Sequence, residues 1–512
     1  MSTIKHSAFL GRRIGSNPSN GSLRSLIEVD APENAEILVD GNDRWTRTRF
    51  AEEVDRFAAG LANAGVRHGE RVVLHLRSGV EIAIAYFACF RLGAIAAPLN
   101  LRFKKPEIEA MFRRLRPIVY IGHADLYQIV APIDIRLLAA DARYVIGEPV
   151  DNLARSWASL RRAPDGLAFR IPDPVVPAVL LSTSGTTGQP KLVAHSQETL
   201  FQVALRLTDL DLREGDKCSF FLPMVHASGL LFFLAALAAG ACLIMSDASD
   251  PDGILDTIEE HRCTYLLAMP TPILRLMEHQ RDRPRDTSSL RFCGTAGDVC
   301  LPGQQQIFPS LFGVPLRSFW ASTEGAGSFV PCLQAGPVNR PHPDVEVKIL
   351  NRAGQSVRSG EPGELLLRGS HIALGYWNGP DELVSFEGGW YRTGDIMQED
   401  RDGNLWFVAR AKDLIVCAGS NISPVEVEHV LASHPAVRDA GVVGIPDPVL
   451  GQRVIGFVQL ANEDDTHRLN EIREFASVHL ANYKIPDRLL QLSFIPRNTF
   501  GKIDRIRLSQ LA

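Results

Sequence analysis

The chain has 512 residues, 45% of them hydrophobic, and a formal net charge of −5. This length predicts about three domain-sized units with large cores, and the charge favours neither a nucleic acid nor an anionic membrane surface as a partner. The eight cysteines form no CxxC pair, so neither a zinc site nor a disulfide framework is expected. The polar N-terminus lacks the apolar core of a signal peptide. Together with the cysteine usage, this predicts a cytoplasmic protein.

Apolar runs alternate with amphipathic stretches through much of the chain. We expect a strand at Arg71–Leu76, a helix at Ile82–Leu92 and a strand at Ala94–Leu99. Because strands that alternate with helices form β-α-β units, the pattern predicts parallel sheets with crossover helices.

A polar segment, Leu181–Leu192, follows the apolar run Ala178–Leu181 and has the sequence LSTSGTTGQPKL. Gly185 and Gly188 let backbone N–H groups approach an anion closely, and the hydroxyls and Lys191 add further donors. The spacing differs from the common P-loop, which has four residues between its glycines and then Gly-Lys-Ser/Thr. A Ser/Thr/Gly loop alone is more often a solvated turn. The strand before it and the lysine after it favour a polyphosphate-binding loop.

The segment from Cys218 to Ser246 contains no Asp, Glu, Lys or Arg and is long enough to span a bilayer. Pro223, His226 and Gly240 interrupt it. We therefore favour a buried strand, helix and strand within a large α/β core over a membrane span.

The pattern changes to short strands and glycine-rich turns at 338–410, which predicts a small β-rich unit. The last hundred residues form a further α/β block. It includes a helix that begins with the capping box Ser423-Pro424-Val425-Glu426. A charged junction at 410–413 separates the two. We expect one domain at 1–411 and a second at 412–512.

Four more clusters carry groups suited to catalysis. Trp320–Glu324 (WASTE) and Tyr391–Asp395 (YRTGD) each end in a carboxylate, Arg410–Asp413 (RAKD) is charged, and Pro496–Lys502 (PRNTFGK) ends in a lysine. Each is weak evidence alone. With the polyphosphate loop, their order and spacing resemble the acyl-adenylate-forming superfamily. It includes acyl-CoA synthetases, aryl-CoA ligases, peptide-synthetase adenylation domains and luciferases.

The resemblance covers nearly the whole chain and implies an α/β fold. A large N-terminal domain has two parallel-sheet subdomains and a small β-barrel-like unit, and a small mobile α+β domain follows. It implies that ATP and a carboxylic acid give an acyl-adenylate, which then reacts with coenzyme A. Two anions must approach each other, so the site needs positive charge and a metal, for which Mg²⁺ is expected.

The resemblance also assigns roles to residues. It implies that the nucleotide phosphates are bound by Thr183, Ser184, Gly185, Thr186, Thr187, Gly188 and Lys191. It implies that Glu324 binds Mg²⁺ and that Thr323 contacts the α-phosphate. Asp395, with Arg410 beside it, is expected to bind the ribose. The adenine is expected to lie against Gly297, Asp298 and Trp320. Family members commonly have tyrosine at the position of Trp320, which is expected to stack on the adenine.

Lys502 is expected to bridge the carboxylate and the α-phosphate during adenylation. Lys412 lies where the family has its hinge. After pyrophosphate leaves, the C-terminal domain is expected to rotate there, withdrawing Lys502 and bringing Gly419 and Ser420 to the path of the thiol.

The acyl pocket is expected to include Val225, His226, Ala227, Gly229 and Ala321. This set contains no carboxylate that could pair with the ammonium of an amino acid, so an apolar aliphatic or aromatic acid is favoured. His226 could equally be a core histidine. Two alternatives stay open: a ligase that loads a separate carrier protein, and an inactive nucleotide-binding protein. No membrane span is expected, and a homodimer is possible.

Overall fold

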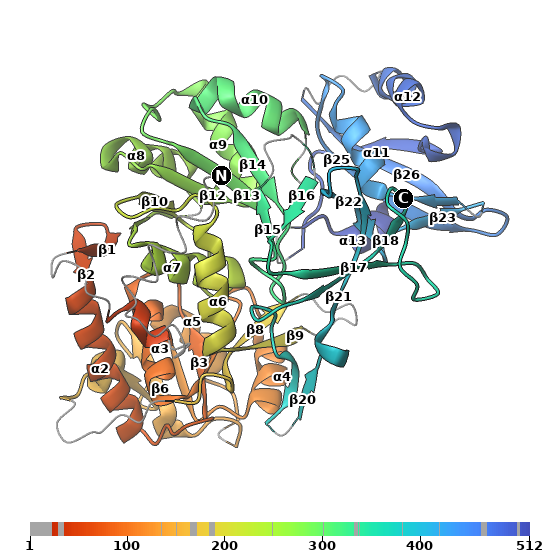
Figure 1. The fold of residues 1–512 in the computed structure, drawn as a ribbon. Coiled ribbons are helices and arrows are strands. Elements are labelled where there is room, and N and C mark those ends of the chain that lie inside the picture. Colours follow the sequence, from red (N-terminus) through yellow and green to blue (C-terminus); the bar gives the residue numbers. More distant parts are fainter. Residues whose placement is uncertain are drawn as a thin grey trace.

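The structure, a computed structural model, describes residues 23–512 except 29–34, 135, 150, 164–171, 184–189, 248, 299, 301, 332–335, 337, 381, 419, 462–467 and 499–501. Within these residues the strands form four sheets (Figure 1). None of the described helices has the length and apolar character needed to cross a membrane. Short 3-10 helices lie at η2 Leu23–Leu26, η3 Ala140–Ala142, η4 Trp157–Leu160, η5 Glu387–Gly389 and η6 Asn482–Lys484.

The largest described sheet has the strand order β20-β19-β9-β8-β4-β3-β5-β6-β7, and its strands from β8 to β7 are parallel. The predicted strand-helix-strand of residues 71–99 is confirmed as β3, α3 and β4. The strands are β3 Arg71–His75, β4 Ile95–Pro98, β5 Val119–His123, β6 Arg143–Ile146, β7 Ala154–Ser156, β8 Pro177–Thr183 and β9 Lys191–Ser196. The helices are α2 Arg47–Asn63, α3 Val80–Leu92, α4 Lys105–Leu115 and α5 Ala124–Val130.

A second sheet has the order β14-β13-β12-β10-β11-β1-β2. Its first strand in sequence, β1, pairs in parallel with β11, and Leu38 lies opposite Leu243. The strands are β1 Glu36–Asp40, β2 Asp43–Thr46, β10 Lys217–Phe220, β11 Cys242–Met245, β12 Tyr265–Ala268, β13 Phe292–Ala296 and β14 Leu316–Phe319. The helices are α6 Gln197–Thr208, α7 Ala227–Ala239, α8 Pro251–His261, α9 Pro270–Asp282 and α10 Pro302–Phe312.

One hydrophobic core joins these two sheets. It contains Val72 and Ile121 from the first sheet, Phe220 and Leu243 from the second, and the apolar helix α7. The uncharged segment 218–246 is therefore a buried strand, helix and strand, as predicted, because its side chains face this shared core.

The β-rich stretch supplies strands to two sheets. An antiparallel sheet of order β15-β16-β22-β21-β18-β17 takes most of them, while β19 pairs with β9 of the first sheet and β20 pairs with β19. This exchange brings β19 beside the strand that follows the polyphosphate loop. The strands are β15 Phe329–Pro331, β16 Val338–Pro341, β17 Glu346–Leu350, β18 Pro362–Arg368, β19 Gly375–Gly379, β20 Glu382–Ser385, β21 Tyr391–Glu399 and β22 Leu405–Arg410.

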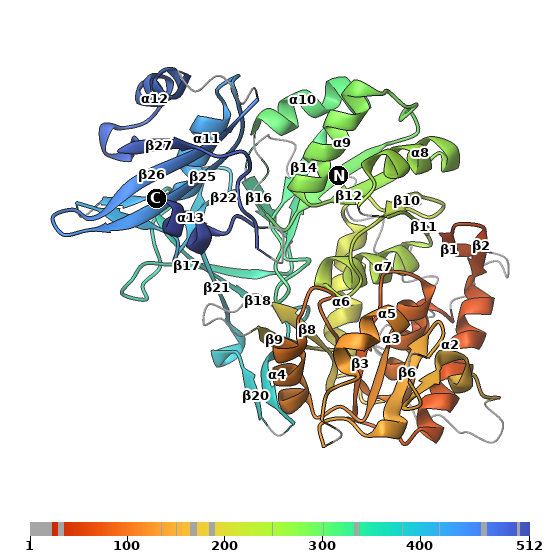
Figure 2. The ribbon, with the colours of Figure 1, turned by 180° about the vertical axis from the view of Figure 1, so that it is seen from behind.

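The C-terminal unit has a sheet of order β24-β23-β26-β25, with β27 paired to β26, and its own hydrophobic core. Figure 1 and Figure 2 show it beside α9 and α10, away from α2 and α3. Its elements are β23 Ile415–Cys417, β24 Ser420–Ile422, α11 Pro424–Ala432, β25 Val437–Asp447, β26 Gly451–Leu460, α12 Arg468–His479, β27 Arg488–Gln491 and α13 Arg505–Leu511. The predicted fold class, mixed α/β with parallel sheets, a half-barrel sheet and a small C-terminal unit, is confirmed.

The predicted capping box of α11 forms only in part. Ser423 caps the helix, because its Oγ accepts from the backbone N–H of Glu426 at 3.1 Å. The side chain of Glu426 instead accepts from Lys484 Nζ at 2.6 Å. The capping box predicted that the Glu426 carboxylate accepts from the backbone N–H of Ser423, but this carboxylate is instead paired with the ammonium of Lys484.

Candidate active site

The carboxyl ends of the parallel strands β10, β12, β13 and β14 lie at one edge of their sheet. Ligands of open α/β sheets commonly bind at such an edge. The predicted acyl loop 225–229 follows β10, residues 297–298 follow β13, and residues 320–324 follow β14. Gly297 has φ +90°, in the left-handed region that favours glycine. Parallel pairing thus gathers predicted site residues that are up to a hundred positions apart.

The polyphosphate loop joins β8 to β9, and Thr183 and Lys191 lie opposite each other in this antiparallel pair. The predicted loop residues Ser184, Gly185, Thr186, Thr187 and Gly188 lie outside the described residues. The base of the loop is therefore described, and the contacts of the residues between remain a prediction.

Tyr376 of β19 links Lys191 to Glu324. Its hydroxyl donates to Glu324 Oε1 at 3.0 Å, and Lys191 Nζ lies 4.4 Å from the centre of its ring. Burial, and then the negative charge of Glu324, raises the pKa of Tyr376, so the hydroxyl keeps its proton. The predicted phosphate-binding lysine and metal-binding carboxylate therefore contact one side chain. Sequence analysis missed Tyr376, because only the pairing of β19 with β9 brings it here.

The backbone of the 320–324 segment is held by buried donors. His195 Nε2 donates to the carbonyl oxygen of Thr323 at 2.8 Å, and the N–H of Ala373 donates to that of Glu324 at 2.9 Å. Burial lowers the pKa of His195 to about 4. Because a carbonyl only accepts, the neutral ring carries its proton on Nε2. His195 is a second residue that the sequence analysis missed.

The carboxylate of Asp395 is held from two sides. Arg410 Nε lies 2.8 Å from Oδ1, and the indole N–H of Trp320 donates to Oδ2 at 2.7 Å. Asp395 and Arg410 are paired residues of β21 and β22. The side chain is 1% exposed, and this burial raises its pKa while Arg410 and Trp320 oppose the rise. Two of the residues predicted to surround the nucleoside, Trp320 and Arg410, thus both contact a third, Asp395.

Lys502 lies close enough to Asp298, Asp395 and Glu324 for their charges to act on it. Burial, and then the positive charge of Arg410, lowers its pKa, while the three carboxylates oppose this. Arg497, in the same segment, lies 4.0 Å from Asp298 and 2.7 Å from Asp439 of β25. The predicted catalytic lysine is thus brought to the carboxylates of the N-terminal domain.

The hairpin of β23 and β24, which carries Ser420 of the predicted coenzyme A path, packs against the turn between β17 and β18. Asn421, next to Ser420, accepts from Arg352 of the turn between β17 and β18 at 3.3 Å. Gly419 lies outside the described residues. Lys412 is exposed directly after β22, between the two units. The predicted coenzyme A segment and Lys502 are therefore not brought to the site together.

The acyl loop packs tightly against its own backbone. A Cβ on Gly229 would lie 2.4 Å from the carbonyl oxygen of Pro223, so no other residue fits there. Tyr86 donates to the carbonyl oxygen of Met224 at 2.7 Å, and Val225 is buried. Burial, and then Arg102, lowers the pKa of His226 to about 4, which makes it a neutral side chain. Ala227 and Ala321 are half-buried.

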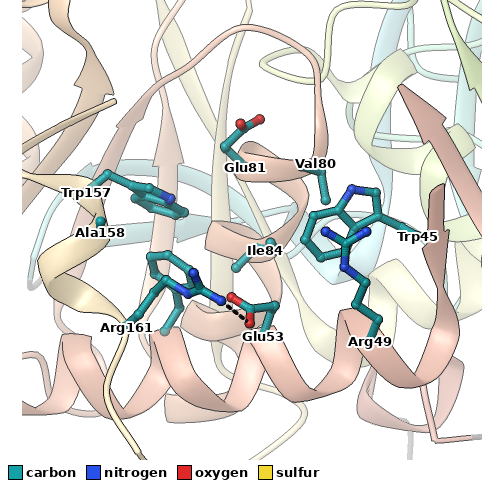
Figure 3. Close-up of a pocket in the computed structure, with 10 residues that line it drawn as sticks. Trp45, Arg49, Glu53, Val80, Glu81, Ile84, Trp157, Ala158 and Arg161 are labelled. Carbon is teal, nitrogen blue, oxygen red and sulfur yellow. Dashed lines mark hydrogen bonds and ion pairs between the residues drawn. The ribbon is translucent and has the colours of Figure 1, made fainter. Parts of the chain in front are cut away.

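A separate pocket lies between α2, α3 and η4 (Figure 3). It contains none of the predicted site residues. Two indole rings, Trp45 and Trp157, face it. Arg161 donates to Glu53 at 2.7 Å, and the Arg49 guanidinium lies 3.6 Å from the Trp45 ring centre. It is distinct from the site at the sheet edge.

A family model described as AMP-binding enzyme matches residues 28–377, and one described as AMP-binding enzyme C-terminal domain matches 426–502. The chain belongs to the AMP-binding enzyme family. The predicted membership of the acyl-adenylate-forming superfamily is thereby confirmed. The two matched ranges lie on either side of the residues predicted to form the hinge.

This AMP-binding enzyme is similar to several CoA ligases. It is 31% identical to indoleacetate–CoA ligase of Aromatoleum aromaticum, covering 90% of this chain and 92% of that protein. It is 28% identical to sulfoacetate–CoA ligase of Cupriavidus necator, covering 95% and 97%. Among solved structures, the anthranilate CoA ligase AuaEII in complex with anthranoyl-AMP matches with TM-score 0.89 and 26% identity, covering 98% and 99%.

The donor set of this AMP-binding enzyme fits a phosphate-bound Mg²⁺. Mg²⁺ usually takes one or two carboxylates, with substrate phosphates and waters completing its shell. Glu324 has one oxygen bonded to Tyr376, and the described residues contain no group of three or more His, Cys, Asp or Glu that could hold a metal alone. The arrangement therefore suits a metal that arrives with a nucleotide.

Proposed function

We propose that this enzyme is an AMP-forming acid–CoA ligase that activates an apolar aliphatic or aromatic carboxylic acid. The observation that supports this most is the convergence of Lys191, Glu324, Asp395 and Lys502 from four separate segments. These groups suit the first half-reaction, in which a carboxylate oxygen attacks the α-phosphorus of ATP and pyrophosphate leaves.

In this first step the cationic side chains reduce the repulsion between the two anions. Lys191 holds the β- and γ-phosphates, with Thr183 and the loop residues 184–188. Glu324 holds Mg²⁺, which when bound neutralises charge on the phosphate oxygens. Thr323 contacts the α-phosphate, and Asp395 accepts from the ribose hydroxyls. Lys502 lies between the carboxylate and the α-phosphate, where it stabilises the charge that develops.

In the second half-reaction the thiolate sulfur of coenzyme A attacks the acyl carbon and AMP leaves. The domains 1–411 and 412–512 rotate about Lys412 between the two steps, which withdraws Lys502 and brings Gly419 and Ser420 to the thiol path. The present arrangement, with Lys502 near Glu324 and Asp395 and with Asn421 bonded to Arg352, suits the first step.

The substrate class is inferred from the acyl loop. Val225 is buried, His226 is neutral, and the predicted pocket residues include no carboxylate to pair with an ammonium. This disfavours amino acids. The relatives named for indoleacetate and for medium-chain fatty acids act on acids of the proposed kind.

The test is a panel of carboxylic acids, read by pyrophosphate release with and without coenzyme A. We expect release that depends on an apolar acid and Mg²⁺, with a thioester formed when coenzyme A is present. Adenylate without thioester, but with transfer to a phosphopantetheine carrier protein, would favour the carrier-loading alternative. If the enzyme consumed no nucleotide with any acid, the remaining alternative would be an inactive nucleotide-binding protein. A cytoplasmic location stays a prediction.

A further inference from the structure

We propose that Trp320 is a positioning residue that aims the carboxylate of Asp395 at the ribose, through its indole N–H. The inference rests on the proposed function, since it requires ATP to be the substrate. Trp320 would then have a second role besides stacking on the adenine, because it would help the enzyme recognise the sugar hydroxyls.

The geometry around Asp395 carries the inference. Trp320 Nε1 lies 2.7 Å from Oδ2, while Arg410 Nε lies 2.8 Å from Oδ1. Each oxygen therefore has its own cationic or polar neighbour, and rotation of the carboxylate about its Cβ–Cγ bond would lengthen both contacts. The backbone of Asp395 is also fixed, because its N–H donates to Thr393 Oγ1 at 3.0 Å.

Trp320 is itself held in place from two directions. Its backbone N–H donates to the side-chain oxygen of Asn339. Its ring packs edge-on against Phe329, with centroids 5.3 Å apart and an interplanar angle of 74°. A bond to a buried carboxylate from so constrained a donor orients the acceptor.

The consequence is a change in discrimination between sugars. Ribose hydroxyls recognised by Asp395 must meet its oxygens in a fixed direction, and a substrate that lacks one of the two hydroxyls gains less from that alignment. Phenylalanine at position 320 keeps an aromatic plane for the adenine but has no N–H. Losing the donor should therefore weaken recognition of ATP more than recognition of 2′-deoxyATP.

The experiment compares the intact wild-type enzyme with Trp320→Phe, using pyrophosphate release with ATP and with 2′-deoxyATP. We expect the ratio of kcat/KM for ATP to kcat/KM for 2′-deoxyATP to fall by about tenfold to 150-fold in the variant, the range for a hydrogen bond to a charged group. Most of the change should lie in KM for ATP, with kcat at saturating ATP nearly unchanged. The matched control is Trp406→Phe, since that indole also donates to an aspartate, Asp400, at 2.9 Å; it should leave the ratio unchanged.

Two further variants keep the inference open to contradiction. Trp320→His retains a ring N–H and should keep more of the discrimination than Trp320→Phe. Added to Asp395→Asn, Trp320→Phe should cause no further loss of discrimination. Equal loss for both nucleotides would mean that Trp320 contributes stacking alone and would overturn this inference while leaving the ligase intact. A wild-type enzyme that consumes no nucleotide with any acid would instead overturn the proposed function.

Discussion

Tyr376 donates a hydrogen bond to Glu324 across 3.0 Å and joins two segments that are 52 positions apart. The same ring lies under the ammonium of Lys191. One side chain thus sets the separation between a carboxylate suited to a metal and a cation suited to phosphate. Because β19 pairs with β9 on one side and with its sequence neighbour β20 on the other, this contact depends on an exchange of strands between sheets.

Replacing Tyr376 by phenylalanine should raise the Mg²⁺ concentration needed for half-maximal activity and lower kcat/KM about tenfold. The hydroxyl that orients Glu324 is lost, while the ring under Lys191 stays, and a hydrogen bond to a charged group is worth about 1.5–3 kcal/mol. Tyr376→Leu should lose about a further twofold to fivefold, because the cation–π contact is also removed. Tyr127→Phe removes a hydroxyl that donates to Asp151 instead. If it lowered activity as much, the role given to Tyr376 would be wrong.

Lys502→Ala should slow adenylate formation by about 10²-fold or more, since electrostatic stabilisation of the developing charge is lost. Thioester formation from a supplied acyl-adenylate should stay within about threefold of wild type, because in the proposed mechanism Lys502 withdraws before that step. The two half-reactions are measured separately, by pyrophosphate exchange and by thioester yield. Lys484→Ala, in the same domain but paired with Glu426, is the control. Equal loss of both half-reactions would contradict the division of labour.

Glu278→Ala should slow adenylation by about twofold to fivefold without slowing thioester formation. Glu278 of α9 lies 2.5 Å from Arg438 of β25, so this ion pair joins the two domains in the present orientation. Exposed pairs contribute at most about 1 kcal/mol, which sets the size of the effect. The exchange Glu278→Arg with Arg438→Glu should restore the rate. Glu346→Ala breaks a pair with Arg368 within one sheet and should change neither half-reaction.

Acid should destabilise the protein between about pH 6.5 and pH 4. His75, His195 and His371 are fully buried, and burial lowers their pKa values from 6.5 to about 4, about 4 and about 3. As the pH decreases, the histidines of the unfolded chain bind protons before those of the folded protein do. The stability contributed by the neutral buried rings is therefore complete above pH 6.5 and decreases as the pH is lowered. Each histidine contributes a slope of about 1.4 kcal/mol per pH unit.

Urea unfolding at several pH values measures this slope. His75→Gln should reduce the slope by the contribution of one histidine, about 1.4 kcal/mol per pH unit. His75 lies away from the site, beside Tyr120 at 3.0 Å, so activity at pH 7.5 offers a check that the variant is folded. A stability that stays level from pH 6.5 to pH 5 would show that these rings are already protonated in the native protein.

Ala321→Gly should extend the acid range toward longer or bulkier acids, because removing a methyl group beside the acyl pocket enlarges it. The preference profile across a panel of acids is the measurement. Ala409→Gly is the control, since it removes the same methyl group from a residue that is fully buried in β22. An unchanged profile in Ala321→Gly would mean that this side chain does not face the acid.

Local patterns in the sequence predicted elements to within a few residues. The strand, helix and strand at 71–99 are examples, since apolar periodicity reports on burial. The exchange of β19 and β20 into another sheet was not predictable in this way, because strand partners depend on register and on contacts far away in sequence. Glu426 likewise pairs with Lys484, 58 positions away, rather than with its own helix end.

The candidate site shows the same division. Motif order predicted that Lys191, Glu324, Asp395 and Lys502 belong together. The residues that hold them were missed, since a tyrosine on a strand and a histidine on an apolar strand carry no local signal. For Trp320, the type of residue suggested stacking, whereas its N–H direction, set by Asn339 and Phe329, determines the bond to Asp395.

The pairing of β1 with β11 has a consequence for synthesis on the ribosome. Leu38 lies opposite Leu243, so the earliest strand must wait while about two hundred further residues are translated. At about 5–20 residues per second this takes roughly 10–40 s. During that interval the nascent β-hairpin of β1 and β2 exposes an unpaired edge, which is a target for chaperones and for unwanted association with other chains.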